Sequence, residues 1–114
     1  IDRVDPFDGG IEIVDYKTGQ AKGAALSSDD KRQLLFYQIA AEESLKLKVE
    51  KLTYYYLESD RRMSFLGKEE EKEKLKQRFI DNISAIKEQK FEAKPSQHVC
   101  PRCDFRNICE FKKL

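Results

Sequence analysis

The chain has 114 residues, 38% charged side chains and a formal net charge of +1. This length leaves room for one domain with a modest core, and the near-neutral charge does not by itself predict nucleic-acid binding. The sequence has no internal repeat, low-complexity tract, signal peptide or apolar membrane segment, so we expect a cytoplasmic protein that does not contact the membrane.

The first seventeen residues predict a β-hairpin that gathers two carboxylates and a lysine. Two β-forming segments flank an acidic residue and two glycines, which is a turn signal. A two-residue loop starting at Asp8 sets Asp2 opposite Asp15, whereas a loop starting at Gly9 sets Asp2 opposite Lys17. In either register the three charged groups share one face, because side chains alternate along a strand. A three-residue loop without a bulge would move Asp2 to the other face.

Two carboxylates and a lysine in one place can hold a divalent metal ion and activate a water molecule. Mg²⁺ and Mn²⁺ prefer oxygen ligands, and a bound ion lowers the pKa of its water. A nearby lysine can orient that water or offset charge that develops at phosphorus. The alternative interpretation is an exposed hairpin whose charges only keep the chain soluble.

A helix is predicted from two candidate N-cap residues, Ser27 and Ser28, onward. Gln33 and Tyr37 are four residues apart and therefore lie on one face of that helix. Its apolar stripe consists of Leu34, Ala41 and Leu45, widened by Leu35 and Ile39.

Two strands joined by a turn are predicted next, over residues 52–57 and 62–66. Alternation sends Tyr54 and Tyr56 to one face and Tyr55 to the other, so the three tyrosines cannot form one base-stacking platform.

Residues 69–89 then predict a long amphipathic helix, and residues 104–112 a short closing helix. The apolar stripe of the long helix consists of Leu75, Phe79, Ile83 and Ile86. The order strand, strand, helix, strand, strand, helix predicts an α/β fold in which a mixed sheet is flanked by helices and followed by a Cys-rich tail.

The three cysteines, Cys100, Cys103 and Cys109, all lie within ten residues. A disulfide framework would favour an even count and an oxidising compartment, so the cluster indicates a metal instead. Three thiolates do not complete a tetrahedral zinc site or a four-cysteine iron–sulfur cluster. His98 could be the fourth zinc ligand, or an ordinary neighbour of Cys100.

The segment Ile1–Asp5 followed by Ile13–Gly19 resembles the core of the PD-(D/E)XK nuclease superfamily, and in particular its RecB-like branch. That branch includes the nuclease domains of RecB and AddB helicase–nucleases and the CRISPR-associated Cas4-type nucleases. The resemblance implies a restriction-endonuclease-like fold and Mg²⁺- or Mn²⁺-dependent hydrolysis of DNA. The implied metal ligands are Asp2, Asp15 and the backbone carbonyl of Tyr16, with Lys17 as a catalytic residue.

Two further elements carry the same resemblance. Gln33 and Tyr37 match the Gln-x-x-x-Tyr element of the RecB-like branch, which implies that they support the substrate or the lysine. The Cys-x2-Cys-x5-Cys spacing resembles the C-terminal trio that holds a 4Fe-4S cluster in AddB-type and Cas4-type nucleases. The resemblance therefore implies a 4Fe-4S cluster in the full-length protein, with Zn²⁺ as the alternative in this chain.

The fourth cluster cysteine and the first motif of the family are absent from this sequence, so we expect a C-terminal fragment of a larger protein. Residues 1–94 would be a nuclease core that lacks its N-terminal part, and residues 95–114 a Cys-rich tail of the same domain. The resemblance implies single-stranded or duplex DNA ends as substrate, exonuclease action in recombination or repair, and a helicase domain or subunit as partner. The alternatives are a non-catalytic metal-stabilised scaffold, a DNA-end-binding module, or a CRISPR-adaptation nuclease.

Overall fold

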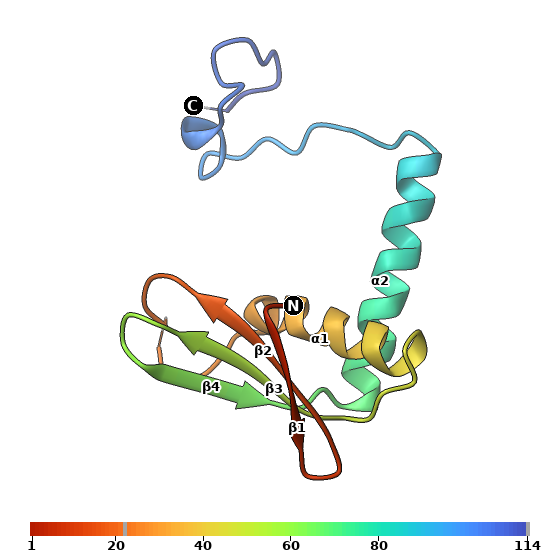
Figure 1. Cartoon of the computed structure of the whole chain (residues 1–114). Helices are drawn as coiled ribbons and strands as arrows, with labels where there is room; N and C mark the ends of the chain where they lie inside the picture. The colour runs from red at the N-terminus through yellow and green to blue at the C-terminus, as the bar shows by residue number, and fades with distance from the viewer. Residues whose placement is uncertain (22, 114) are drawn as a thin grey trace. The chain divides into compact units, whose positions relative to one another are not determined.

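The computed structural model describes residues 1–21 and 23–113. Its elements follow the predicted order of strand, strand, helix, strand, strand, helix (Figure 1). They are β1 (Arg3–Phe7), β2 (Gly10–Lys17), α1 (Ser28–Glu43), β3 (Val49–Tyr56), β4 (Arg61–Phe65), α2 (Glu69–Lys87) and the short 3₁₀ helix η1 (Cys100–Arg102). The chain divides into two compact units, residues 1–80 and residues 81–114.

The β1–β2 hairpin adopts the first of the two predicted registers. Phe7 pairs with Gly10, and the two residues between them, Asp8 and Gly9, have φ values of 46° and 79°. Positive φ at both central residues is the requirement of the tight turn that suits a twisted two-strand hairpin. The pairing ends at Arg3 and Val14. One residue further along, this register would set Asp2 opposite Asp15.

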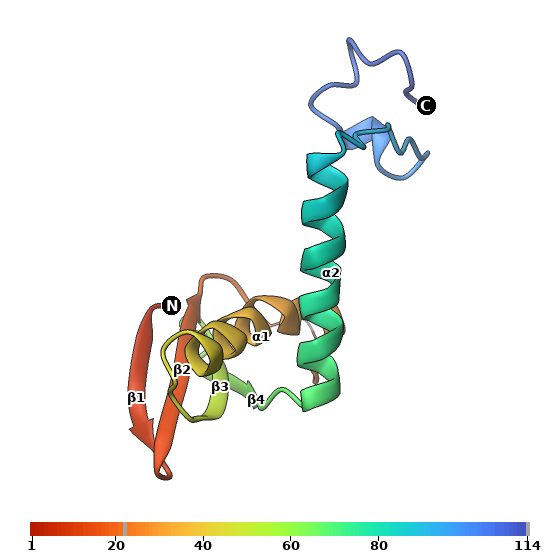
Figure 2. The same ribbon diagram turned by 90° about the vertical axis from the view of Figure 1, so that its right-hand side faces the viewer.

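The four strands form one mixed sheet in the order β1-β2-β3-β4, which confirms the predicted fold class. The strands β2 and β3 are parallel, from Ile11 opposite Val49 to Lys17 opposite Tyr56, and the other two pairs are antiparallel. A parallel pair needs a long crossover connection, and α1 provides it. In Figure 2 α1 lies against one face of the sheet, where it contacts β2 and β3.

The core lies between that face and α1. It consists of Ile13, Leu34, Ala41, Val49, Leu52 and Tyr54. Helix α1 begins with a capping box, in which Ser27 and Asp30 bond to each other's backbone N–H groups. The prediction that Leu45 joins the core was wrong. Its exposed fraction is 65%, because α1 ends at Glu43 and leaves Leu45 beyond the covered face.

The first part of α2 packs as predicted, but the second does not. Leu75 is buried against Leu35 and Ile39 of α1, and Phe79 makes an edge contact with Phe36 at 5.0 Å between ring centroids. Ile83 and Ile86 are 51% and 58% exposed. The predicted stripe is therefore wrong beyond Phe79, the last residue of α2 in the apolar cluster with α1. Among the described residues, no helix is long and apolar enough to cross a bilayer.

The tail forms turns in place of the predicted helix over residues 104–112. Its backbone bonds include Arg106 N–H to Cys103 O and Cys109 N–H to Phe105 O, which close isolated turns. Phe105 and Ile108 are 67% and 82% exposed, so the segment has no packed face. A helix this short is not stable without tertiary packing, which explains why the prediction was wrong.

Candidate active site

Strand β2 positions Asp15 and Lys17 on the sheet face that α1 covers. Asp15 is only 6% exposed, because its strand has a neighbour on each side and its side chain faces the helix. The Nζ atom of half-buried Lys17 lies 3.0 Å from Asp15 Oδ2. A buried carboxylate is costly without a partner, and here the lysine provides the compensating charge.

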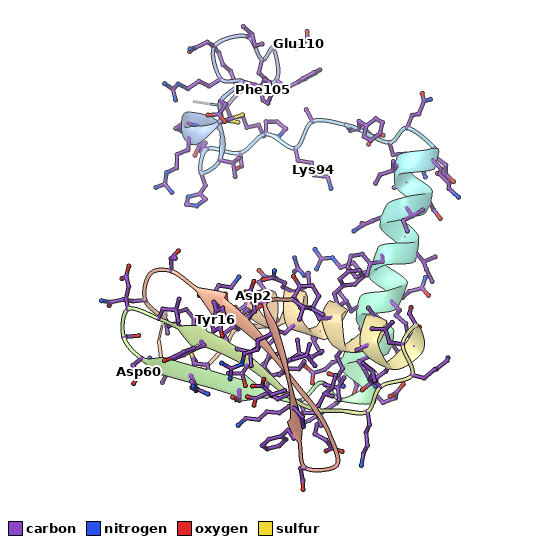
Figure 3. The ribbon with its side chains drawn as sticks, viewed as in Figure 1. Asp2, Tyr16, Asp60, Lys94, Phe105 and Glu110 are labelled. Atoms are coloured by element: carbon purple, nitrogen blue, oxygen red, sulfur yellow. The ribbon has the colours of Figure 1, made fainter. Side chains whose placement is uncertain are left out.

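Asp2 lies at the same end of β2, just before β1 begins. Its Oδ2 atom accepts a hydrogen bond from the backbone N–H of Tyr16 at 2.8 Å. Figure 3 labels both residues and shows them together at this end of the hairpin. The backbone bond fixes the Asp2 carboxylate beside the strand that carries Asp15.

The backbone carbonyl of Tyr16 faces the side on which Asp2 lies. Leu57 N–H donates to Lys17 O at 3.1 Å, so the Lys17 carbonyl faces β3. Successive carbonyls alternate along a strand, and the Tyr16 carbonyl therefore faces β1. The Tyr16 side chain is not part of the site, because its hydroxyl accepts a bond from Arg3 on the opposite sheet face.

The helix α1 adds two polar side chains to the lysine. Lys17 Nζ donates to Gln33 Oε1 at 2.9 Å, and Gln33 Nε2 donates to the Tyr37 hydroxyl at 2.9 Å. The two helical residues meet because positions four apart are neighbours on a helix surface. The structure thus joins four of the predicted site residues into one chain of contacts, Asp15–Lys17–Gln33–Tyr37.

The sequence analysis did not assign Tyr54 to the site. It is directly opposite Asp15 in the parallel pair, and its ring lies 5.1 Å from Lys17 Nζ. Its hydroxyl donates to the Asp30 carbonyl at 2.6 Å. Burial, and then the charge of Asp15, raises the pKa of Tyr54 to about 12, so its phenol stays neutral at pH 7. The alternation of the tyrosines indicated its face, but only the strand pairing brings it to Asp15.

A cavity of about 220 Å³ opens beside Lys17. Its walls are Lys17 from β2, Tyr54 and Tyr56 from β3, and Asp29, Asp30 and Gln33 from α1. The lysine amine therefore borders a space that a substrate group could enter.

The donor set at the end of β2 is suited to a hard divalent ion. Among residues 1–21 and 23–113, no group of three or more His, Cys, Asp or Glu side chains could hold a metal. Mg²⁺, however, commonly binds through one or two carboxylates and keeps water and substrate phosphate oxygens as its remaining ligands. Asp2, Asp15 and the Tyr16 carbonyl provide oxygen donors of this kind and leave such positions open.

The three cysteines are free thiols in the second unit. Cys100 is buried, and Cys103 and Cys109 are half-buried. The backbone of η1 links the first two, with Cys103 N–H donating to Cys100 O at 3.2 Å. Within the part of the chain that the structure describes, these thiols and His98 do not make a metal-binding group of three.

Comparison with protein-family models matches residues 1–110 to the PD-(D/E)XK nuclease superfamily. A search of curated proteins found no match. The matched segment includes the hairpin with Asp2, Asp15 and Lys17, the helix α1 with Gln33 and Tyr37, and the cysteine tail. It covers nearly the whole chain, and the chain belongs to the PD-(D/E)XK nuclease superfamily.

Proposed function

We propose that the chain is the catalytic part of a metal-dependent deoxyribonuclease. The observation that carries the proposal is the contact chain Asp15–Lys17–Gln33–Tyr37, which borders a cavity at the strand end where Asp2 is fixed. A purely solubilising hairpin would not need a buried Asp15 or a lysine held by two partners. Membership of a nuclease superfamily supports the same function.

Asp2, Asp15 and the Tyr16 carbonyl would hold Mg²⁺ or Mn²⁺. The ion would act as a Lewis acid toward a phosphate oxygen and lower the pKa of a bound water. The protein contributes the fixed position of the ligands: β1 and the Tyr16 N–H hold Asp2, while the buried face holds Asp15. Such pre-positioning avoids reorganisation during the reaction.

Lys17 would act directly on the substrate. An ammonium group has three donors, and Asp15 and Gln33 occupy two of them. The third remains for the attacking water or a phosphate oxygen in the adjoining cavity. A positive charge at that point would stabilise the charge that develops on phosphorus during hydrolysis.

Gln33 and Tyr37 are positioning residues in this proposal. The Gln33 amide oxygen accepts from the lysine, while its amide nitrogen donates to Tyr37. The tyrosine hydroxyl thereby fixes which way the amide faces and presents the oxygen to the lysine. Loss of either group would leave Lys17 charged but less well oriented.

The experiment is degradation of end-labelled linear DNA and closed circular DNA by the full-length protein, with and without Mg²⁺ or Mn²⁺. We expect metal-dependent cleavage, which Lys17→Ala reduces about 100-fold or more. Lys48→Ala is the matched control, because Lys48 pairs with Glu50 at the far end of the sheet. Cleavage of linear DNA alone would support the exonuclease assignment. Equal rates for wild type and Lys17→Ala would refute the catalytic role.

The cysteine tail is proposed to belong to the same domain as the nuclease core and to hold a 4Fe-4S cluster. Cys100, Cys103 and Cys109 would be three of its ligands, and the fourth cysteine would come from outside this chain. The support is the spacing of the trio and a tail in which the one helix among residues 95–113 is the three-residue η1. Iron, sulfide and zinc content of anaerobically purified protein tests this. Zinc at one atom per chain without iron would refute the cluster.

We also propose that a helicase domain or subunit delivers the DNA, in recombination or repair. The support is the chain's net charge of only +1, which provides little general attraction for nucleic acid. Co-purification of DNA-unwinding activity with the nuclease tests the partner. Nuclease that purifies without it would refute this assignment and leave the catalytic proposal intact.

A further inference from the structure

A second cavity, of about 350 Å³, lies at strand β4 and is distinct from the cavity beside Lys17. β4 is the last strand of the sheet, and within the described residues no strand pairs with its outer edge. The loop Ala24–Leu26 forms the other wall. Two basic residues line the cavity from the sheet face that α1 covers, Lys31 of α1 and Arg61 of β4. Arg62 of β4 also borders it, but its guanidinium lies over Tyr55 on the opposite sheet face.

Lys31 and Arg61 are not paired with acidic side chains. Within residues 1–21 and 23–113, neither of them forms an ion pair. Lys31 Nζ lies 5.3 Å from the centre of the Phe65 ring. A cation–π contact positions a cation and leaves its charge intact.

The nearest acidic neighbour of Arg61 in sequence, Asp60, accepts a hydrogen bond from the hydroxyl of Tyr55, the residue on which Arg62 stacks. By contrast, Lys72, Lys74 and Lys76 on α2 all pair with glutamates. Among the described residues the protein thus places two cations without an ion pair beside one cavity, although its net charge is only +1.

The basic cavity is next to the candidate active site. Arg61 is directly opposite Tyr56 and Met63 is opposite Tyr54, and both tyrosines line the cavity beside Lys17. Neighbouring strands are about 4.8 Å apart, so β2 and β4 are separated by about 10 Å. The basic cavity is therefore about 10 Å from the strand that carries Asp15 and Lys17.

We propose that this basic cavity is a phosphate-binding subsite, which holds the nucleic-acid backbone about 10 Å from the catalytic strand β2. We call it the β4 subsite, defined by Lys31 and Arg61. The inference rests on the proposed function of the neighbouring site. Contacts of cations with phosphates position a strand without reading its sequence. A peptide paired with the β4 edge would need the backbone of the strand and not two cations.

The test measures binding of a fluorescein-labelled single-stranded oligonucleotide to the full-length protein, without added divalent metal, by anisotropy at increasing salt. The double variant Lys31→Gln, Arg61→Gln is compared with wild type. We expect about tenfold weaker binding at 50 mM salt and a log–log salt slope smaller by about 1.4, since each lost phosphate contact removes about 0.7. The charge-matched control is Lys48→Gln, Lys74→Gln, for which we expect binding close to wild type.

A second readout separates this inference from the catalytic proposal. Thymidine 5′-monophosphate p-nitrophenyl ester has a single phosphodiester and does not reach the β4 subsite. The double variant should cleave it within about twofold of the wild-type rate, while its cleavage of a long single strand falls. If wild type cleaves neither substrate, the catalytic proposal fails and the binding comparison still decides the subsite.

A wild-type salt slope in the double variant, or equal weakening in the charge-matched control, would overturn the β4 subsite. Arg61 provides a variant that does not endanger folding, because its side chain is exposed and makes no ion pair among the described residues. Arg61→Gln alone should reduce the slope by about 0.7, and Arg61→Lys should restore it. Thermal melting of each variant verifies that it is folded.

Discussion

Replacement of Gln33 by Met tests the contact chain at its middle. The side chains have similar length, but Met cannot accept the bond from Lys17 Nζ or donate to the Tyr37 hydroxyl, both of which are 2.9 Å long. A hydrogen bond to a charged group contributes about 1.5 to 3 kcal/mol. The low end applies here, because Gln33 is exposed and water can partly replace the bond.

A loss of about 1.5 kcal/mol in the transition state corresponds to a decrease in kcat of about tenfold. Tyr37→Phe removes only the group that orients the amide, so its decrease should be smaller, about threefold, for a bond of about 0.7 kcal/mol. Because both residues act through the lysine, KM for DNA should stay close to the wild-type value. Single-turnover cleavage of an end-labelled oligonucleotide in Mg²⁺ measures the rate, and steady-state kinetics separates kcat from KM.

A double-mutant cycle isolates the interaction. In a Lys17→Ala background, Gln33→Met should have almost no further effect, because its partner is already absent. A full tenfold effect of Gln33→Met in that background would refute the positioning role. So would a larger effect of Tyr37→Phe than of Gln33→Met.

Three further predictions concern stability. Folding raises the pKa of Tyr54 from 10.0 to about 12, so its neutral phenol contributes fully to the free energy of unfolding below pH 10, and this contribution is lost as the pH rises toward 12. Urea denaturation should show that wild type loses about 2 to 3 kcal/mol more stability over this range than Tyr54→Phe. Parallel pH curves for the two proteins would contradict the raised pKa. Ser27→Ala should lower the free energy of unfolding by about 1 kcal/mol, because it removes the capping box of α1, whereas Ser28→Ala should change it little. Equal losses for the two variants in urea denaturation would show that Ser27 is not the N-cap. Leu75→Ala should lower the free energy of unfolding by about 2 to 5 kcal/mol in the same assay, because Leu75 is buried. Ile83→Ala should lower it by less than about 0.5 kcal/mol, because Ile83 is exposed. Similar losses for the two variants would reveal a packing partner for Ile83.

Local rules explain what the sequence predicted well. The turn at Asp8 and Gly9 determines the hairpin register, and the register brings Asp2 to the end of β2, where it binds the Tyr16 N–H. Helical spacing places Gln33 beside Tyr37. Each of these features depends on residues that are close in sequence, where turn type and side-chain periodicity leave few alternatives.

Features that depend on distant pairing could not be predicted. The parallel register of β2 and β3 brings Tyr54 beside Asp15, and the edge position of β4 creates the basic cavity at Arg61. Neither follows from periodicity, because a strand pattern does not specify its neighbour. The error at Ile83 has a related cause: an apolar stripe shows which side of a helix can be buried, but not where its partner ends.

The most direct test of the central claim is the effect of Asp15→Asn on DNA cleavage in saturating Mg²⁺ or Mn²⁺. This substitution keeps the shape of the buried side chain and removes the negative charge that a metal ligand needs at this position. We expect loss of metal-dependent cleavage by about 100-fold or more in a protein whose thermal melting still shows a folded state. A folded Asp15→Asn protein that cleaves DNA at the wild-type rate in both metals would contradict the assignment of this strand end as the catalytic centre.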